Sequence, residues 1–185
     1  MIKVLTIICL FSLYSCSSSP ASKAVNNSPQ KCLGSSNLSE ILKISFLITE
    51  DEKLLSGSIG APDKGKLCQG QVYKSKEDSK ITIFRVWNST NPNSKLGKWW
   101  AFHKPSGKIS NYRSEYEICP EWSPLDKLVS CTLKPGATVV VGTGQSAECS
   151  EYLTYPTSDK QQIYINDASL SVENCTLLDG EFSWK

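Results

Sequence analysis

Cysteine is the residue that most constrains how this chain can fold. Eight cysteines occur in 185 residues, and six of them lie between positions 32 and 175. An even set in an exported chain is typical of a disulfide framework, and six cysteines allow fifteen pairings. No pair has CxxC spacing and the chain has one histidine, which argues against a zinc site. The sequence therefore predicts three disulfides, and Cys119 and Cys131 are expected to pair because they flank a short turn. The six residues are Cys32, Cys68, Cys119, Cys131, Cys149 and Cys175.

Export is indicated by the first sixteen residues, MIKVLTIICLFSLYSC. One lysine precedes an apolar run that is too short to span a bilayer, so residues 1–15 are predicted to be a signal peptide. The LYSC tetrapeptide that ends the run resembles the lipobox of bacterial lipoproteins. That resemblance implies cleavage before Cys16, acylation of Cys16 and a membrane anchor on the periplasmic or cell-surface side. The alternative is an ordinary signal peptide that is cut a few residues later and leaves a soluble protein.

The remaining chain divides into a tether and one domain. Residues 16–31 are rich in Ser, Asn and Pro and show no apolar period, so we expect a disordered tether. Residues 32–185 have a length that suits one globular domain with a single core. The formal net charge of +2 provides no electrostatic footprint for nucleic acid, so we expect no nucleic-acid partner.

Short β-branched and aromatic runs dominate the domain and predict strands. Residues 109–118 are the best helix, with Ser110 as its cap, an Arg113–Glu117 surface pair and Pro120 as its end. Residues 40–49 fit helix or strand equally well, and residues 50–70 are predicted to be mostly loop. The fold class is therefore α+β, a β-rich single domain with one or two helices. The predicted strands are 71–74, 81–87, 98–102, 127–133, 137–142, 161–166 and 181–184, with residues 134–136 as a hairpin turn between two of them.

Few side chains in this pattern point to chemistry. Arg85 lies in the middle of a strand, where it faces water or clamps an anion. Trp99 and Trp100 point to opposite faces of a strand, so at most one lines a pocket while the other packs inside. His103 is expected in an exposed loop. The GTGQS segment at 142–146 lacks the lysine of a P-loop and the GxSxG pattern of a nucleophile elbow, so it is predicted to be a turn.

The order of these motifs resembles the ADP-ribosyltransferase-like domains of bacterial secreted toxins and effectors. It comprises a strand arginine, GxWWxF, a YRxxY helix, a CPEW corner, an xPGxxVxxG hairpin and a YP…QxYI strand, and it covers residues 81–166. The resemblance implies that Arg85 binds the phosphates of NAD. Trp99, Trp100 and Phe102 take the place of the second strand, where the family usually has Ser or Thr. Gln162 or Gln161 takes the place of the glutamate that grips the ribose.

This departure from the family affects the expected chemistry. A glutamine brings no negative charge to an oxocarbenium-like transition state, so the resemblance implies that Glu121 or Glu115 supplies the carboxylate. No cofactor follows from the residues themselves, and NAD is the substrate that the resemblance implies. The alternative is a non-catalytic binding or structural lipoprotein whose aromatic side chains contact a carbohydrate or protein. If the resemblance holds, Arg85 and Gln162 should lie on neighbouring central strands in one cleft.

Overall fold

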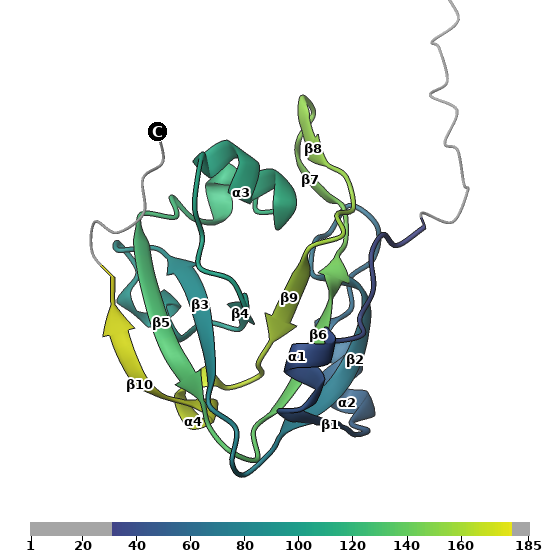
Figure 1. Ribbon diagram of the computed structural model, residues 1–185. Coiled ribbons are helices and arrows are strands. Elements are labelled where there is room, and N and C mark those ends of the chain that lie inside the picture. The colour runs from purple at the N-terminus through teal and green to yellow at the C-terminus, as the bar shows by residue number, and fades with distance from the viewer. Residues whose placement is uncertain (1–30, 179–185) are drawn as a thin grey trace, which may run out of the picture.

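The structure, a computed structural model, describes residues 31–178. Two antiparallel sheets face each other across the main core (Figure 1). The five-stranded sheet has the order β1-β2-β6-β9-β4, and the three-stranded sheet has the order β10-β5-β3. The strand-rich α+β class predicted from the sequence is confirmed, but residues 31–178 contain four α-helices where one or two were expected. The predicted signal peptide, Cys16, the tether up to residue 30 and the strand at 181–184 lie outside the described residues.

The five-stranded sheet comprises β1 (Phe46–Ile48), β2 (Leu67–Ser75), β6 (Thr138–Gly144), β9 (Gln161–Tyr164) and β4 (Trp99–Trp100). The three-stranded sheet comprises β10 (Val172–Leu177), β5 (Lys127–Leu133) and β3 (Ile81–Trp87). A two-stranded ribbon of β7 (Ala147–Ser150) and β8 (Leu153–Tyr155) projects beside them. A single bridge between Phe84 and Ala101 connects β3 to the residue that follows β4.

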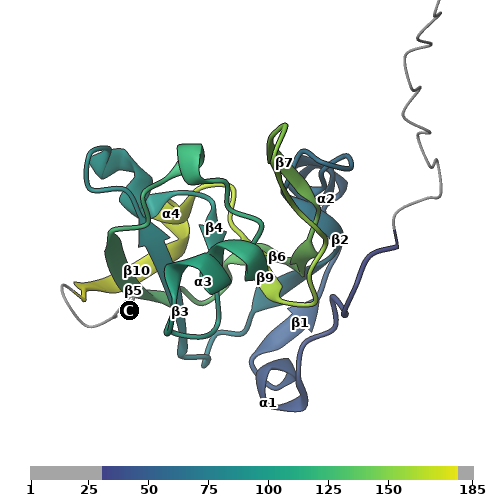
Figure 2. The same ribbon diagram turned by 90° about the horizontal axis from the view of Figure 1, so that it is seen from above.

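Short helices close the ends and one face of these sheets. They are α1 (Glu40–Lys43), α2 (Glu52–Ser58), α3 (Ile109–Glu115) and α4 (Ala168–Ser171), with the 3₁₀ turns η1 (Pro92–Leu96) and η2 (Pro120–Trp122). Seen from above, α3 lies between β3 and β9 and so spans the junction of the two sheets (Figure 2). No helix within residues 31–178 is long and apolar enough to cross a membrane.

The helix predictions were partly wrong. Residues 40–49 form both a helical turn and a strand, because the chain passes from α1 directly into β1. Residues 52–58, predicted to be loop, form α2, whose N-cap Asp51 accepts a hydrogen bond from the Leu54 amide at 2.8 Å. The helix predicted over 109–118 ends at Glu115, and Ser110 does not cap it, because Lys108 occupies the N-cap position.

The hairpin predicted at residues 134–136 is also wrong. Both edges of β5 are occupied, by β3 and β10, so β6 cannot pair with it. Residues 134–136 instead carry the chain from one sheet to the other. Gly136 has φ 75° and donates its amide to the Ser75 carbonyl at 3.0 Å. This connection places the two sheets face to face, where β3, β5, β6 and β9 supply most of the core.

The three predicted disulfides are present, but the expected Cys119–Cys131 pair is wrong. Cys32 bonds Cys68 at the start of β2, Cys119 bonds Cys149 of β7, and Cys131 of β5 bonds Cys175 of β10. Cys131 lies inside a strand with a partner strand beside it, whereas Cys119 precedes η2 on another side of the fold. Each closed loop of this kind contributes roughly 3 kcal/mol by restricting the unfolded chain. The bridges are consistent with an oxidising periplasmic or extracellular environment.

Candidate functional site

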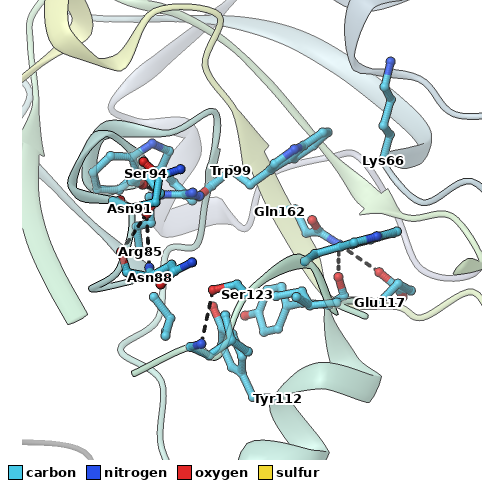
Figure 3. A pocket seen from close by; sticks show the side chains of 16 residues that line it. Lys66, Arg85, Asn88, Asn91, Ser94, Trp99, Tyr112, Glu117, Ser123 and Gln162 are labelled. Carbon is cyan, nitrogen blue, oxygen red and sulfur yellow. Dashed lines mark hydrogen bonds between the residues drawn. The ribbon is translucent and has the colours of Figure 1, made fainter. Parts of the chain in front are cut away.

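A pocket of about 270 Å³ lies where β3, β4 and β9 meet α3 and η2. Its lining combines aromatic rings with a few charged and amide groups, the mixture found in small-molecule sites. In Figure 3 the labelled Arg85 lies toward one end of the pocket and Glu117 toward the other. The lining residues are Lys66, Arg85, Val86, Asn88, Asn91, Ser94, Trp99, Trp100, Tyr112, Tyr116, Glu117, Ile118, Trp122, Ser123, Leu125 and Gln162.

Arg85 is held at its end of the pocket by backbone carbonyls. Its Nε donates to the Ser94 carbonyl at 2.7 Å and its Nη1 donates to the Trp99 carbonyl at 2.6 Å. Gly97 allows this arrangement, because a Cβ there would lie 2.3 Å from Nη2. Desolvation by burial lowers the pKa of Arg85 to about 10, so the side chain stays charged at neutral pH.

The charge on Arg85 has no counter-charge in the described part of the chain. No carboxylate among residues 31–178 forms an ion pair with Arg85, and its Nη2 makes no hydrogen bond there. A desolvated guanidinium is stabilised by an anion that it can bind through paired hydrogen bonds. This end of the pocket is therefore suited to a phosphate or carboxylate.

Glu117 forms the opposite end and is the least expected residue of the site. It follows α3 in a left-handed conformation, with φ 48°, which is uncommon for a residue other than glycine. This conformation turns the side chain inward, where it is only 2% exposed. Burial raises the pKa of Glu117 to about 8, while the polar groups of Ser158 and Gln162 oppose the rise. Glu117 is therefore mostly protonated at neutral pH.

Two residues of the five-stranded sheet fix the Glu117 carboxyl. The Gln162 side chain on β9 donates its amide to Oε2 at 2.9 Å and reaches the Tyr116 carbonyl at 3.4 Å. Gly144 on β6 provides the space, since a Cβ there would lie 1.6 Å from Oε2. Oε1 is buried without a hydrogen-bond partner among residues 31–178. A buried, unpaired carboxyl oxygen is costly, and such groups concentrate at functional sites.

Aromatic rings form the walls between these two ends. Trp99 packs against Tyr164, with ring centroids 4.9 Å apart, and Tyr112 packs against Tyr116 at 4.5 Å. Trp122 is half exposed, and its ring would lie 3.0 Å from a Cβ at Gly65. Flat, polarisable surfaces of this kind bind planar rings and cations.

The predicted residues are only partly brought together. Arg85, Trp99 and Gln162 line one pocket. Trp100 is buried in the main core, as expected for one of the pair, but it also lines the pocket, so the prediction that at most one of the two does is wrong. Arg85 and Gln162 do not lie on neighbouring strands, because β3 belongs to the three-stranded sheet and β9 to the five-stranded sheet. The two sheets instead meet at this pocket. His103 is exposed, as predicted.

The two carboxylates predicted from the resemblance lie outside the pocket lining. Glu121 is exposed on η2 beside Cys119 and Cys149, whose sulfurs bond each other and so are not metal ligands. Glu115 is also exposed and lies 3.9 Å from Lys160. Gln161 donates to backbone carbonyls of the segment before α1 rather than lining the pocket.

Glu117 is the functional candidate that the sequence did not reveal. The helix predicted over residues 109–118 would place Glu117 on the surface, four residues after Arg113. Arg113 instead donates to backbone carbonyls of Ile118, Cys119 and Ser123. The only available signal was the crowding of polar and aromatic residues before Cys119, which does not distinguish a buried glutamate from an exposed one.

Fold and site together define a disulfide-tied α+β domain with a small pocket that carries a cation at one end and a buried carboxyl at the other. No family model, curated protein or solved structure matches the chain. The inference of function therefore depends on the geometry of the pocket.

Proposed function

We propose that this protein is an exported, lipid-anchored domain of ADP-ribosyltransferase or NAD glycohydrolase type, and that its pocket binds NAD. The observation that carries the proposal is that Arg85, Trp99 and Gln162 line a single pocket although they come from separate sheets. These are the residues that the family resemblance assigns to the dinucleotide. These residues lie close together because the two sheets face each other, and not because their strands are neighbours in one sheet.

The pocket offers a complementary group for each part of a nucleotide. Arg85 would pair with a phosphate, the rings of Trp99 and Trp122 would contact a planar base, and Gln162 would bond a ribose hydroxyl. A volume of about 270 Å³ lies near the lower end of the range for ligand pockets. We expect it to take the nicotinamide nucleotide half of NAD, while the other half extends past Lys66 at the rim.

Glu117 determines how fast such a ligand would react. Hydrolysis of NAD breaks the bond between the ribose C1′ and the nicotinamide nitrogen. The electron pair leaves with nicotinamide, and a water molecule adds to C1′ and loses a proton. An ionised carboxylate beside C1′ would stabilise the positive charge that develops there. Since burial raises the pKa of Glu117 to about 8 in the empty pocket, we expect hydrolysis at low NAD concentration to be slower at pH 7 than at pH 9.

Calorimetry with the detergent-solubilised full chain tests the proposal. Arg85→Lys keeps the charge but loses the paired geometry, so NAD affinity should fall about ten- to a hundredfold. Arg113→Lys is the matched control, because Arg113 also donates to backbone carbonyls but does not line the pocket. Absence of heat with millimolar NAD, or an equal loss in both variants, would contradict the proposal.

A second candidate is a binding lipoprotein without catalysis. It is favoured by the lack of an ionised carboxylate in the empty pocket at neutral pH, since Glu117 is mostly protonated there and Gln162 is uncharged. Such a protein would hold its ligand unchanged. Prolonged incubation separates the two candidates, because binding without release of nicotinamide at pH 7 and at pH 9 identifies the non-catalytic protein.

A further inference from the structure

The two ends of the pocket carry opposite and incompletely satisfied groups. Arg85 is a desolvated cation whose Nη2 has no hydrogen-bond partner in residues 31–178. The Oε1 atom of Glu117 is buried and likewise has no partner in that range. Gln162 bonds the other oxygen, so the carboxyl is oriented but only half satisfied. A ligand that completed both ends would need an anionic group and a cationic group.

We propose that the pocket selects a zwitterionic ligand, whose anionic group binds Arg85 and whose cationic group lies beside Glu117, and that binding expels the proton of Glu117 to solvent. The identity of the ligand rests on the proposed function. In oxidised NAD, the cationic group is the nicotinamide ring and the anionic group is the phosphate.

The groups that face Glu117 show why a ligand must supply this cation. Ser158 places its hydroxyl and its backbone amide near the Glu117 carboxyl, and the hydroxyl donates to the Glu115 carbonyl at 2.7 Å. Tyr116 is a titratable neighbour, and neither residue adds a positive charge. Lys160 lies 3.9 Å from Glu115, at the surface. Lys66 is exposed and donates to the Gly57 carbonyl at 3.2 Å.

Arg85 lies toward the other end of the pocket and donates to backbone carbonyls there. No Lys, Arg or His within residues 31–178 forms an ion pair with Glu117. The rings of Trp99, Tyr116 and Trp122 line the same pocket and are surfaces on which a cation is stable. The position beside Glu117 therefore favours a positive charge twice, through the rings and through the carboxylate that forms.

Proton release follows from the protonation of the empty pocket. Burial raises the pKa of Glu117 to about 8, so roughly nine-tenths of the molecules carry the proton at pH 7. A cation beside the carboxyl favours the ionised form and lowers this pKa in the complex. About 0.9 proton should then leave for each ligand bound at pH 7. Affinity should rise about tenfold for each pH unit up to about pH 8 and stay level above it.

Oxidised and reduced NAD form a matched pair of probes for this inference. Both carry the same phosphates, but the nicotinamide ring is cationic only in the oxidised form. Titration of the full chain at pH 7, in two buffers with different ionisation enthalpies, measures affinity and proton release together. We expect oxidised NAD to bind about ten- to a hundredfold more tightly than NADH and to release the proton, while NADH releases none. Glu117→Gln should abolish the release and reduce the difference between the two affinities to the few-fold preference that the aromatic rings provide.

The outcomes separate this inference from the proposed function. Equal binding of oxidised and reduced NAD without proton release overturns the inference and leaves NAD binding intact. Failure of both to bind refutes the proposed function. The inference is then decided by the same titration with phosphocholine, a small zwitterion, against phosphate alone. Proton release with phosphocholine but not with phosphate supports it, and release with neither overturns it.

Discussion

Glu117 should make the stability of this protein fall as the pH rises through the neutral range. Its pKa is raised by burial from 4.5 to about 8 in the folded protein. Between these two values the folded state binds the proton and the unfolded state does not. Each pH unit in that window therefore removes stability, by about 1.4 kcal/mol for a single group. The stabilising effect of the proton is fully present below pH 4.5 and is lost by about pH 8.

The loss of stability caused by Glu117 is large over the pH range of an ordinary unfolding experiment. Between pH 5 and pH 8 the free energy of unfolding should fall by about 3.5 kcal/mol because of Glu117 alone. Above pH 8 the decline should level off, because both states are then ionised. For a domain of this size the change corresponds to a melting-temperature difference of roughly 7–14 °C.

Glu117→Gln isolates this contribution. A neutral amide of nearly the same shape can still accept the Gln162 hydrogen bond through its carbonyl oxygen, and it does not titrate. Urea unfolding of wild type and variant, with disulfides intact, should give free energies that diverge by about 3.5 kcal/mol from pH 5 to pH 8. Glu115→Gln is the control, because Glu115 is exposed. Parallel pH curves for wild type and Glu117→Gln would refute the reasoning.

The remaining predictions concern the packing of the site and the proposed membrane anchor. Gly144→Ala should destabilise the fold by about 1–3 kcal/mol, since its Cβ would overlap the buried carboxyl. Gly57→Ala, in α2 with 3.7 Å to the nearest atom, should instead stabilise it by about 0.5–1 kcal/mol. Thermal unfolding checks both, and shifts of the same sign would contradict the packing argument. Cys16→Ala should abolish incorporation of labelled palmitate in cells and Cys9→Ala should not, so equal labelling of the two variants would exclude acylation at Cys16.

The positions of the strands could be predicted from the sequence, because runs of β-branched residues recur between turn residues. The predicted strands at 81–87 and 127–133 coincide with β3 (Ile81–Trp87) and β5 (Lys127–Leu133). Which strands pair could not be predicted, because residues 134–136 are compatible both with a hairpin turn and with a connection between two sheets. Disulfide pairing had the same limitation, since spacing alone does not bring Cys119 near Cys149.

Only part of the site could be predicted from the sequence, for a related reason. Arg85 is conspicuous because a guanidinium in a strand needs a partner, and the structure supplies carbonyls from Ser94 and Trp99. Glu117 is inconspicuous because its role depends on a left-handed φ and on the missing Cβ of Gly144. Neither feature follows from hydrophobic periodicity, which describes only regular helices and strands.

The bridge between Cys119 and Cys149 has a consequence for the cell that makes this protein. It ties the segment that carries Glu117 to β7, two residues after the carboxyl that ends the pocket. Before export, the thiols of a newly made chain are kept reduced, so this restraint on the pocket is missing. Under the proposed function, a precursor retained in the cytoplasm would lack the tied pocket. The reduced precursor should then bind NAD more weakly than the oxidised, exported protein.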